Sequence, residues 1–172
     1  MEIGLGAVNA TFCVYVEHAP KLAPYNSLSS VTSLLPNEIA HIGNECGNGW
    51  RKIFNVYSKL VFELDPENYR KQGVNTWQAL RDKHLLQQHD CHALLFSAPN
   101  LSATNKCHII AGRTYAKKLI QQQPWPLQLI WLDEEFAIDQ EHNVIVCPFF
   151  DYRQLSNVKI TYLVSLIKSL GN

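Results

Sequence analysis

Residues 91–100 read Cys91-His92-Ala93-Leu94-Leu95-Phe96-Ser97-Ala98-Pro99-Asn100, a short apolar run that ends at a proline. A run of this length predicts a buried strand, and the proline closes it because proline cannot donate a ladder hydrogen bond. Similar runs occupy residues 11–17, 127–132 and 143–147. Strands that are apolar throughout are typical of a parallel sheet covered on both faces.

Helical patterns lie between these runs. From Asn48 to Leu64, apolar residues recur at spacings of three and four, which predicts one face of an amphipathic helix with Asn48 as its N-cap. Further helices are predicted over residues 76–88 and 155–170. Because strands and helices alternate, the sequence predicts a single α/β domain over residues 1–172, with a mainly parallel sheet between helices.

One segment allows two interpretations. We favour a single helix over residues 102–122 that begins at Ser102 or Thr104, because the apolar residues near its end have helical spacing. Residues 107–112 could instead form a brief strand, with a turn at Gly112 before a shorter helix.

Charge and cysteine content exclude several classes of protein. Fifteen Lys and Arg balance fifteen Asp and Glu, which argues against binding dominated by a phosphate backbone. No stretch approaches the roughly 20 apolar residues of a membrane span, and no secretory signal pattern opens the chain, so we expect a cytoplasmic protein with no membrane partner. The five cysteines include no Cys-x-x-Cys pair, which predicts free thiols.

No metal or cofactor site is predicted. The seven histidines include no His-x-x-x-His pair, and the chain has neither a Walker loop nor a Gly-x-Gly-x-x-Gly motif. Cys13, Cys91 and Cys147 are expected inside apolar strands, where burial keeps a thiol inert. Nucleophilic cysteine chemistry is therefore not expected.

Polar residues that follow the apolar runs are the candidates for a ligand site, because ligands bind beyond the carboxyl ends of the strands in an open α/β sheet. Glu17 and His18 could serve acid–base chemistry, although adjacent strand residues point to opposite faces. Asp151 and Arg153 could bind a polar ligand, and Asp151 could instead cap the last helix. The remaining candidates are Ser97, Asn100, Phe149 and the acidic pair Asp133 and Glu134, which could also belong to a turn.

Taken in order, these segments resemble the uracil-DNA glycosylase superfamily over nearly the whole chain. Residues 14–16 resemble its first strand, 48–54 the start of the helix before its second strand, 88–97 the second strand, and 144–156 the fourth strand with its loop. The resemblance implies a three-layer α/β/α fold with a mainly parallel four-stranded sheet. It also implies a water-activating motif after the first strand and a His-Pro-Ser-Pro-Leu loop after the fourth.

The resemblance assigns roles to single residues. Glu17 stands in place of the family's water-activating aspartate, and Ser97, with Asn100 three residues later, stands near its base-reading asparagine. Phe149 or Phe150 falls where the family has the histidine that stabilises the developing charge. An aromatic ring cannot donate that hydrogen bond, a loss worth several kcal/mol of transition-state stabilisation. Lost or altered glycosylase activity is therefore expected, and whether the chain is an enzyme stays open.

The implied partner is DNA or a nucleobase, with no cofactor. Tyr25, Phe149 and Phe150 could stack on a base, and Arg153 could contact phosphates at the rim of a pocket. The alternative is a non-catalytic α/β module that binds a protein or a small molecule. The neutral net charge and the missing histidine favour this alternative.

Overall fold

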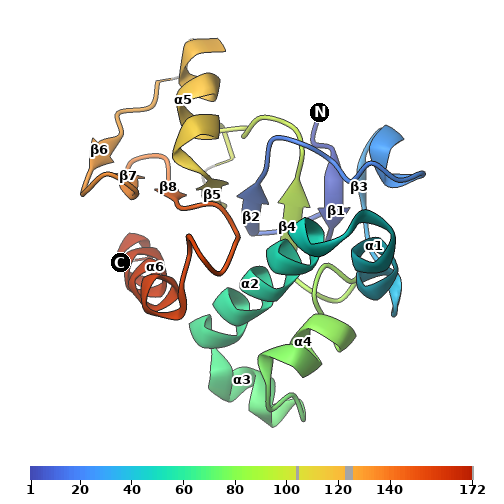
Figure 1. Cartoon of the computed structure of the whole chain (residues 1–172). Helices are drawn as coiled ribbons and strands as arrows, with labels where there is room; N and C mark the ends of the chain where they lie inside the picture. Colours follow the sequence, from blue (N-terminus) through green and yellow to red (C-terminus); the bar gives the residue numbers. More distant parts are fainter. Residues whose placement is uncertain (104, 123–125, 172) are drawn as a thin grey trace.

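In the part of the chain that the computed structural model describes, residues 1–103, 105–122 and 126–171, eight strands form one mixed sheet (Figure 1). The strand order is β3-β1-β4-β2-β5-β8-β7-β6. The strands are β1 (Gly4–Gly6), β2 (Phe12–Tyr15), β3 (Val31–Thr32), β4 (His92–Leu95), β5 (Cys107–Ala111), β6 (Ile130–Trp131), β7 (Ala137–Asp139) and β8 (Val144–Cys147). The helices are α1 (Glu38–Cys46), α2 (Asn48–Leu64), α3 (Pro66–Lys71), α4 (Trp77–Lys83), α5 (Arg113–Gln122) and α6 (Asn157–Leu170), with a 3-10 turn at Tyr25–Ser27.

The centre of the sheet is parallel, as predicted. β2 pairs in parallel with β4 on one side and with β5 on the other, and β5 pairs in parallel with β8. The prediction of four strands is wrong, because β1, β3, β6 and β7 extend the sheet at its edges. β6 lies within the predicted run 127–132, but only Ile130 and Trp131 pair and both are exposed, so this run is not the buried strand that was predicted. β1, β3 and β7 are two or three residues long, too short for a hydrophobic period to reveal them in the sequence.

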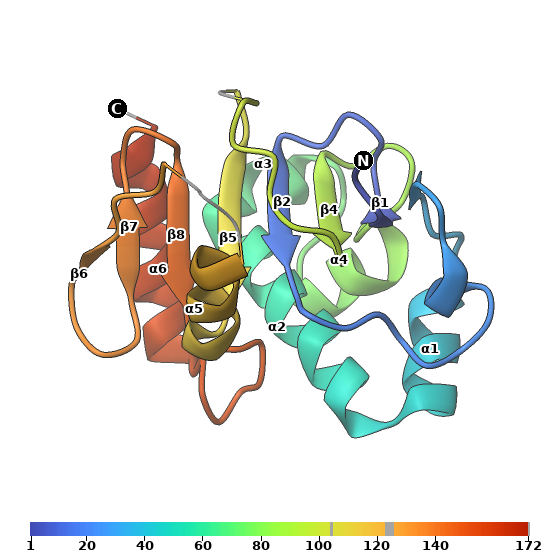
Figure 2. The same ribbon diagram turned by 90° about the horizontal axis from the view of Figure 1, so that it is seen from above.

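Helices cover both faces of the sheet. Figure 2 shows α5 on one face, and α1 to α4 with α6 on the other. Successive strand residues point to opposite faces, so Val14 and Ile109 pack in the core beneath the larger helix layer. Tyr15 and Ile110, the next residues along, belong to the smaller clusters beside α5.

The long helix α2 lies where the sequence predicts it, at Asn48–Leu64. Its N-cap is Gly47 and not Asn48. The buried residues of α2 recur at helical spacing on one side, from Ile53 to Val61, which is the apolar face that the pattern predicts. This helix crosses the sheet in the middle of the larger helix layer (Figure 1).

The favoured single helix over residues 102–122 is wrong. Cys107–Ala111 is strand β5, in the centre of the sheet between β2 and β8, and only Arg113–Gln122 is helical. Gly112 lies between them with a φ of 105°, a conformation that glycine adopts readily and that ends the strand before the helix begins. Thr104, one of the two proposed starts, lies outside the described residues.

Cysteine burial matches the prediction at two of three strand positions. Cys13 and Cys147 are fully buried inside β2 and β8. Cys91 is exposed, because β4 begins one residue later, at His92, and Cys91 lies in the turn before it. All five thiols are free. None of the described helices is long and apolar enough to cross a membrane.

Candidate functional site

A cavity of about 820 Å³ lies beyond the carboxyl ends of β2, β5 and β8, a volume that suits a small ligand. Residues 16–19 follow β2 into it, residues 111–115 join β5 to α5 along its wall, and Phe149 enters from the loop after β8. The start of α2 and the turn between β6 and β7 complete the lining. β2 leads to α1 and α2 on one face of the sheet, whereas β5 leads to α5 on the other (Figure 2). Ligands of open α/β sheets bind where the chain diverges in this way.

Glu17 and His18 both line this cavity. Strand alternation does not separate them, because β2 ends at Tyr15 and the chain beyond it is free to turn. Lys118 on α5 donates a hydrogen bond to one Glu17 oxygen, and His18 Nε2 lies 3.6 Å from the other. The Lys118 hydrogen bond lowers the pKa of the Glu17 carboxyl group, so the group is ionised at neutral pH. A carboxylate held in this way is a weak general base.

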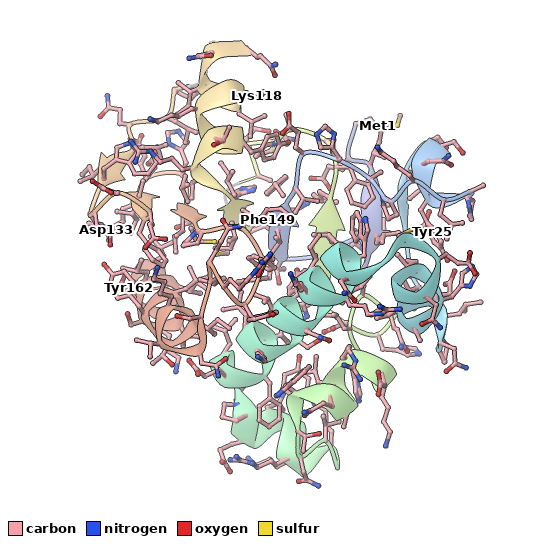
Figure 3. The ribbon with its side chains drawn as sticks, viewed as in Figure 1. Met1, Tyr25, Lys118, Asp133, Phe149 and Tyr162 are labelled. Atoms are coloured by element: carbon pink, nitrogen blue, oxygen red, sulfur yellow. The ribbon has the colours of Figure 1, made fainter. Side chains whose placement is uncertain are left out.

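Three aromatic residues, Trp50, Tyr115 and Phe149, line the cavity. The Trp50 ring is held from inside by Phe54 and by Phe96, with ring centroids 5.7 and 6.2 Å away. Burial, together with the negative charge of Glu17, raises the pKa of Tyr115 to about 12. Figure 3 shows Phe149 near the middle of the molecule, between α5 and the start of α2. The cavity therefore offers aromatic surface from three separate elements.

The first turn of α5 forms one wall of the cavity. Gly112 is held at the end of β5 by a hydrogen bond from its N–H to the Cys147 carbonyl, 2.8 Å long. The first helical bond of α5 runs from Ala116 N to Gly112 O, so the N–H groups of residues 113–115 precede the helical ladder. A hypothetical Cβ on Gly112 would lie 3.9 Å from Phe149, which shows how closely the two loops approach each other.

Charges around the cavity are close to balanced. Four glutamates line it, at positions 17, 45, 134 and 135, against two cations, Lys21 and Arg113. Ion pairs with Lys118 and Lys159 neutralise Glu17 and Glu135. The remaining two glutamates match the two cations in number, so the lining has no excess of positive charge to attract a phosphate.

Tyr25, Ser97 and Asn100 are among the predicted site residues that lie outside the cavity lining, and each makes hydrogen bonds elsewhere in the fold. Tyr25 is buried, and its hydroxyl donates a 2.5 Å hydrogen bond to Glu38; it lies on the α1 side of the molecule (Figure 3). Ser97 Oγ accepts a hydrogen bond from Ile3 N, which ties the N-terminal strand to the end of β4. Asn100 Oδ1 accepts two hydrogen bonds within its own turn.

Asp151 and Arg153 bind each other. Arg153 donates to Asp151 from its backbone N and from Nη2, at 2.9 and 3.0 Å, and Lys52 Nζ lies 3.4 Å away. The hydrogen bonds from the Arg153 side chain, and then from its backbone, hold the pKa of Asp151 well below its usual range. Asp151 does not cap the last helix, because the N-cap of α6 is Ser156. Of the predicted residues, the fold brings Glu17, His18, Glu134 and Phe149 to the cavity.

Two aromatic residues are among the cavity residues that the sequence did not predict. Trp50 belongs to the helix predicted from Asn48 to Leu64, and its position in the first turn of α2 places it at the end of the helix that borders the cavity. The single helix favoured for residues 102–122 places Tyr115 in the middle of a helix, away from any strand end, so Tyr115 was not predicted as a site residue. The alternative with a strand and a turn at Gly112 would have placed it in the first turn after a strand end.

Ligand-type side chains gather at a different place. Among the described residues, Asp90, Cys91 and His92 form the group whose ligand atoms lie close enough to hold a metal ion. They lie at the amino end of β4, the opposite end of the parallel strands from the cavity.

Comparison with known proteins identifies a family but no activity. A family model described as a family of unknown function (DUF6942) matches residues 3–168. Comparisons with curated proteins and with solved structures give no match.

Proposed function

We propose that this chain, which belongs to the family of unknown function DUF6942, binds a nucleobase or nucleoside in the cavity beyond β2, β5 and β8. We further propose that it does not excise uracil from DNA. The observation that carries the proposal is the meeting of Trp50, Tyr115 and Phe149 around a cavity of about 820 Å³ at the point where the chain diverges to the two faces of the sheet.

Aromatic lining is the first support for a planar ligand. Stacking of a base on an aromatic side chain is worth about 1–3 kcal/mol. Trp50 is held in place by Phe54 and Phe96, so little rotamer freedom is lost when a base stacks on it. The buried side chain of Ile53 adds apolar surface to the same lining.

Backbone donors are the second support. The N–H groups at the start of α5 precede its helical hydrogen bonds and lie along the wall of the cavity. The carbonyl oxygens and ring nitrogens of a nucleobase can accept hydrogen bonds from such groups. Because Lys21 and Arg113 are matched by glutamates, a neutral base or nucleoside suits this lining better than a phosphorylated one.

The resemblance to uracil-DNA glycosylases supports the choice of ligand class. In that family a water-activating motif follows the first strand, and here Glu17 follows β2 into the cavity. The family's catalytic histidine loop follows its fourth strand, and here Phe149 occupies the cavity from the loop after β8. Both positions that the resemblance identifies thus border one cavity, but with different chemistry.

That chemistry argues against excision. Glu17 is ionised, hydrogen-bonded to Lys118 and of lowered pKa, which makes it a poor base for activating water. Phe149 cannot donate a hydrogen bond to a developing oxyanion, so the largest electrostatic contribution to such catalysis is missing. We therefore propose that the chain binds a base without cleaving a glycosidic bond.

Calorimetric titration tests the proposal. Uracil, uridine, adenosine and uridine 5′-monophosphate are titrated separately into the full chain and into the Trp50→Leu variant. We expect a base or nucleoside to bind, the monophosphate to bind no more tightly, and Trp50→Leu to weaken binding at least about fivefold, as the loss of one stacking contact predicts. Trp77→Leu is the matched control, because Trp77 lies on α4 outside the cavity lining.

Two outcomes would overturn the proposal: no binding of any of these compounds, or equal binding by the wild type and Trp50→Leu. A single-stranded oligonucleotide carrying uracil tests the second part, and an abasic product would overturn it. A gel shift at low salt separates base binding from DNA binding. The net charge of zero predicts no tight, salt-sensitive complex.

A further inference from the structure

Three consecutive side chains with metal-ligand atoms converge at the amino end of β4. The ligand atoms of Asp90, Cys91 and His92 all lie within 4.8 Å of one another. Cys91 Sγ lies 3.8 Å from His92 Nδ1, and Asp90 Oδ1 lies 2.6 Å from the same nitrogen. The turn before β4 brings them together, whereas residues of a regular strand would point alternately to opposite faces.

One oxygen of this group has no partner. The Asp90 side chain is 93% buried, since 7% of it is exposed. Its Oδ2 atom is buried without a hydrogen-bond partner among the described residues. A buried carboxylate oxygen without a partner costs free energy, and coordination to a cation removes that cost.

We propose that Asp90, Cys91 and His92 bind a zinc ion. Thiolate and imidazole are the ligands that zinc prefers, and a carboxylate oxygen is its third common ligand. A thiolate sulfur excludes magnesium and calcium, which take oxygen ligands. When zinc binds, the protons of His92 Nδ1 and of the Cys91 thiol pass to solvent, and the hydrogen bond between His92 Nδ1 and Asp90 Oδ1 is replaced by coordination of the imidazole and the Asp90 carboxylate to the ion. Three protein ligands leave the fourth position to water, as in catalytic zinc sites.

Neighbouring groups hold the ligands in position. Asp90 Oδ1 accepts a hydrogen bond from the Cys91 backbone N at 2.9 Å, which fixes the turn. The rings of Phe12 and Tyr57 meet the His92 imidazole edge-on, with centroids 5.6 and 6.2 Å away. Such an apolar shell orients a histidine ligand and limits access of water to it. Cys91 is exposed, so an ion can enter from solvent on that side.

Cobalt and zinc titrations test the site on the full chain after removal of metal with a chelator. One equivalent of Co²⁺ should give the charge-transfer absorption of a cobalt–thiolate bond, and Zn²⁺ should displace it. Cys91→Ser should abolish the absorption and weaken zinc binding at least about tenfold. Asp90→Asn should weaken zinc binding and leave the absorption with Co²⁺ detectable.

His41→Gln serves as the control, because His41 is an exposed histidine on α1, outside the group. It should bind zinc as the wild type does. Zinc should also slow alkylation of Cys91 by iodoacetamide, measured by peptide mass spectrometry, while alkylation of the half-buried Cys46 stays unchanged. Binding of less than one equivalent by the wild type, or zinc affinity unchanged in Cys91→Ser, would overturn the assignment. None of these three readouts depends on nucleobase binding.

Discussion

Lys118 donates a hydrogen bond to Glu17, a residue 101 positions earlier in the sequence. The bond joins the segment after β2 to the outer side of α5, so it connects two walls of the candidate cavity. It also lowers the pKa of Glu17, because a nearby ammonium group stabilises the ionised carboxylate.

Removal of this ammonium group should raise the pKa of Glu17. In Lys118→Met, we expect the carboxyl pKa, followed by carbon-detected NMR titration, to rise toward its ordinary value of 4.5. Since the folded pKa is lowered, the pair stabilises the fold above the unfolded pKa, and this contribution disappears as the pH falls. It is small, below about 1 kcal/mol, because half of Lys118 is exposed. Lys117→Met is the control and should leave the titration unchanged; identical curves for the two variants would contradict the assignment.

The buried pair of Tyr15 and His108 should make stability depend on pH. The Tyr15 hydroxyl lies 2.8 Å from His108 Nδ1, and His108 Nε2 lies 3.4 Å from the Ala103 carbonyl. Both contacts are satisfied by a neutral ring that accepts from Tyr15 and donates to Ala103. Burial lowers the pKa of His108 below its ordinary 6.5; the other charged or titratable groups that act on it are Lys106, Glu2 and His142.

Because the folded pKa is lowered, the neutral ring stabilises the fold fully above pH 6.5, and this contribution is lost as the pH falls below that value. The loss reaches at most about 1.4 kcal/mol per pH unit. His108→Gln keeps an acceptor and a donor but does not titrate. Urea unfolding at about pH 7.5 and 5.5 should therefore show a smaller pH dependence in the variant. An equal or larger dependence in His108→Gln would refute the prediction.

Gly6 should tolerate no side chain. It has a φ of 125°, and a Cβ there would lie 2.3 Å from the His92 carbonyl oxygen of the neighbouring strand β4. Gly6→Ala should cost more than about 2 kcal/mol of unfolding free energy, because β1 would have to move away from β4. Gly73 also has a positive φ, of 81°, but its Cβ would meet nothing within 4 Å. Gly73→Ala should lower the unfolding free energy only by the backbone strain, about 1–2 kcal/mol. Similar losses of unfolding free energy in Gly6→Ala and Gly73→Ala would contradict the prediction, because they would show that the contact with the His92 carbonyl is relieved.

Long, regular segments were predictable from the sequence. The helix at Asn48–Leu64 and the strands β2, β4 and β8 each bury many apolar residues in a repeating or continuous pattern. β5 was misassigned because its apolar residues continue into those of α5, and Gly112 alone separates them. The edge strands β1, β3 and β7 were missed because pairing with a neighbour, and not their own composition, makes them strands.

The residues of the candidate cavity were likewise predictable only in part. Glu17, His18 and Phe149 were found because each follows an apolar run, and such positions lie at the carboxyl edge of a parallel sheet wherever the strands are placed. Ser97, Asn100, Asp151 and Arg153 were chosen by the same rule, and Tyr25 was chosen as an aromatic residue that could stack on a base. All five lie outside the lining and make hydrogen bonds elsewhere in the fold.

By itself, the sequence determined the class of fold and the edge of the sheet where the candidate cavity lies, because both follow from the spacing of apolar residues along the chain. Tertiary structure alone decided that Lys118 holds Glu17 and that Trp50 and Tyr115 reach the same cavity as Phe149. It also decided that Cys91 lies exposed beside His92 and not within a strand. Contacts between residues far apart in the chain depend on strand order and helix placement. The local spacing of apolar residues determines neither of them.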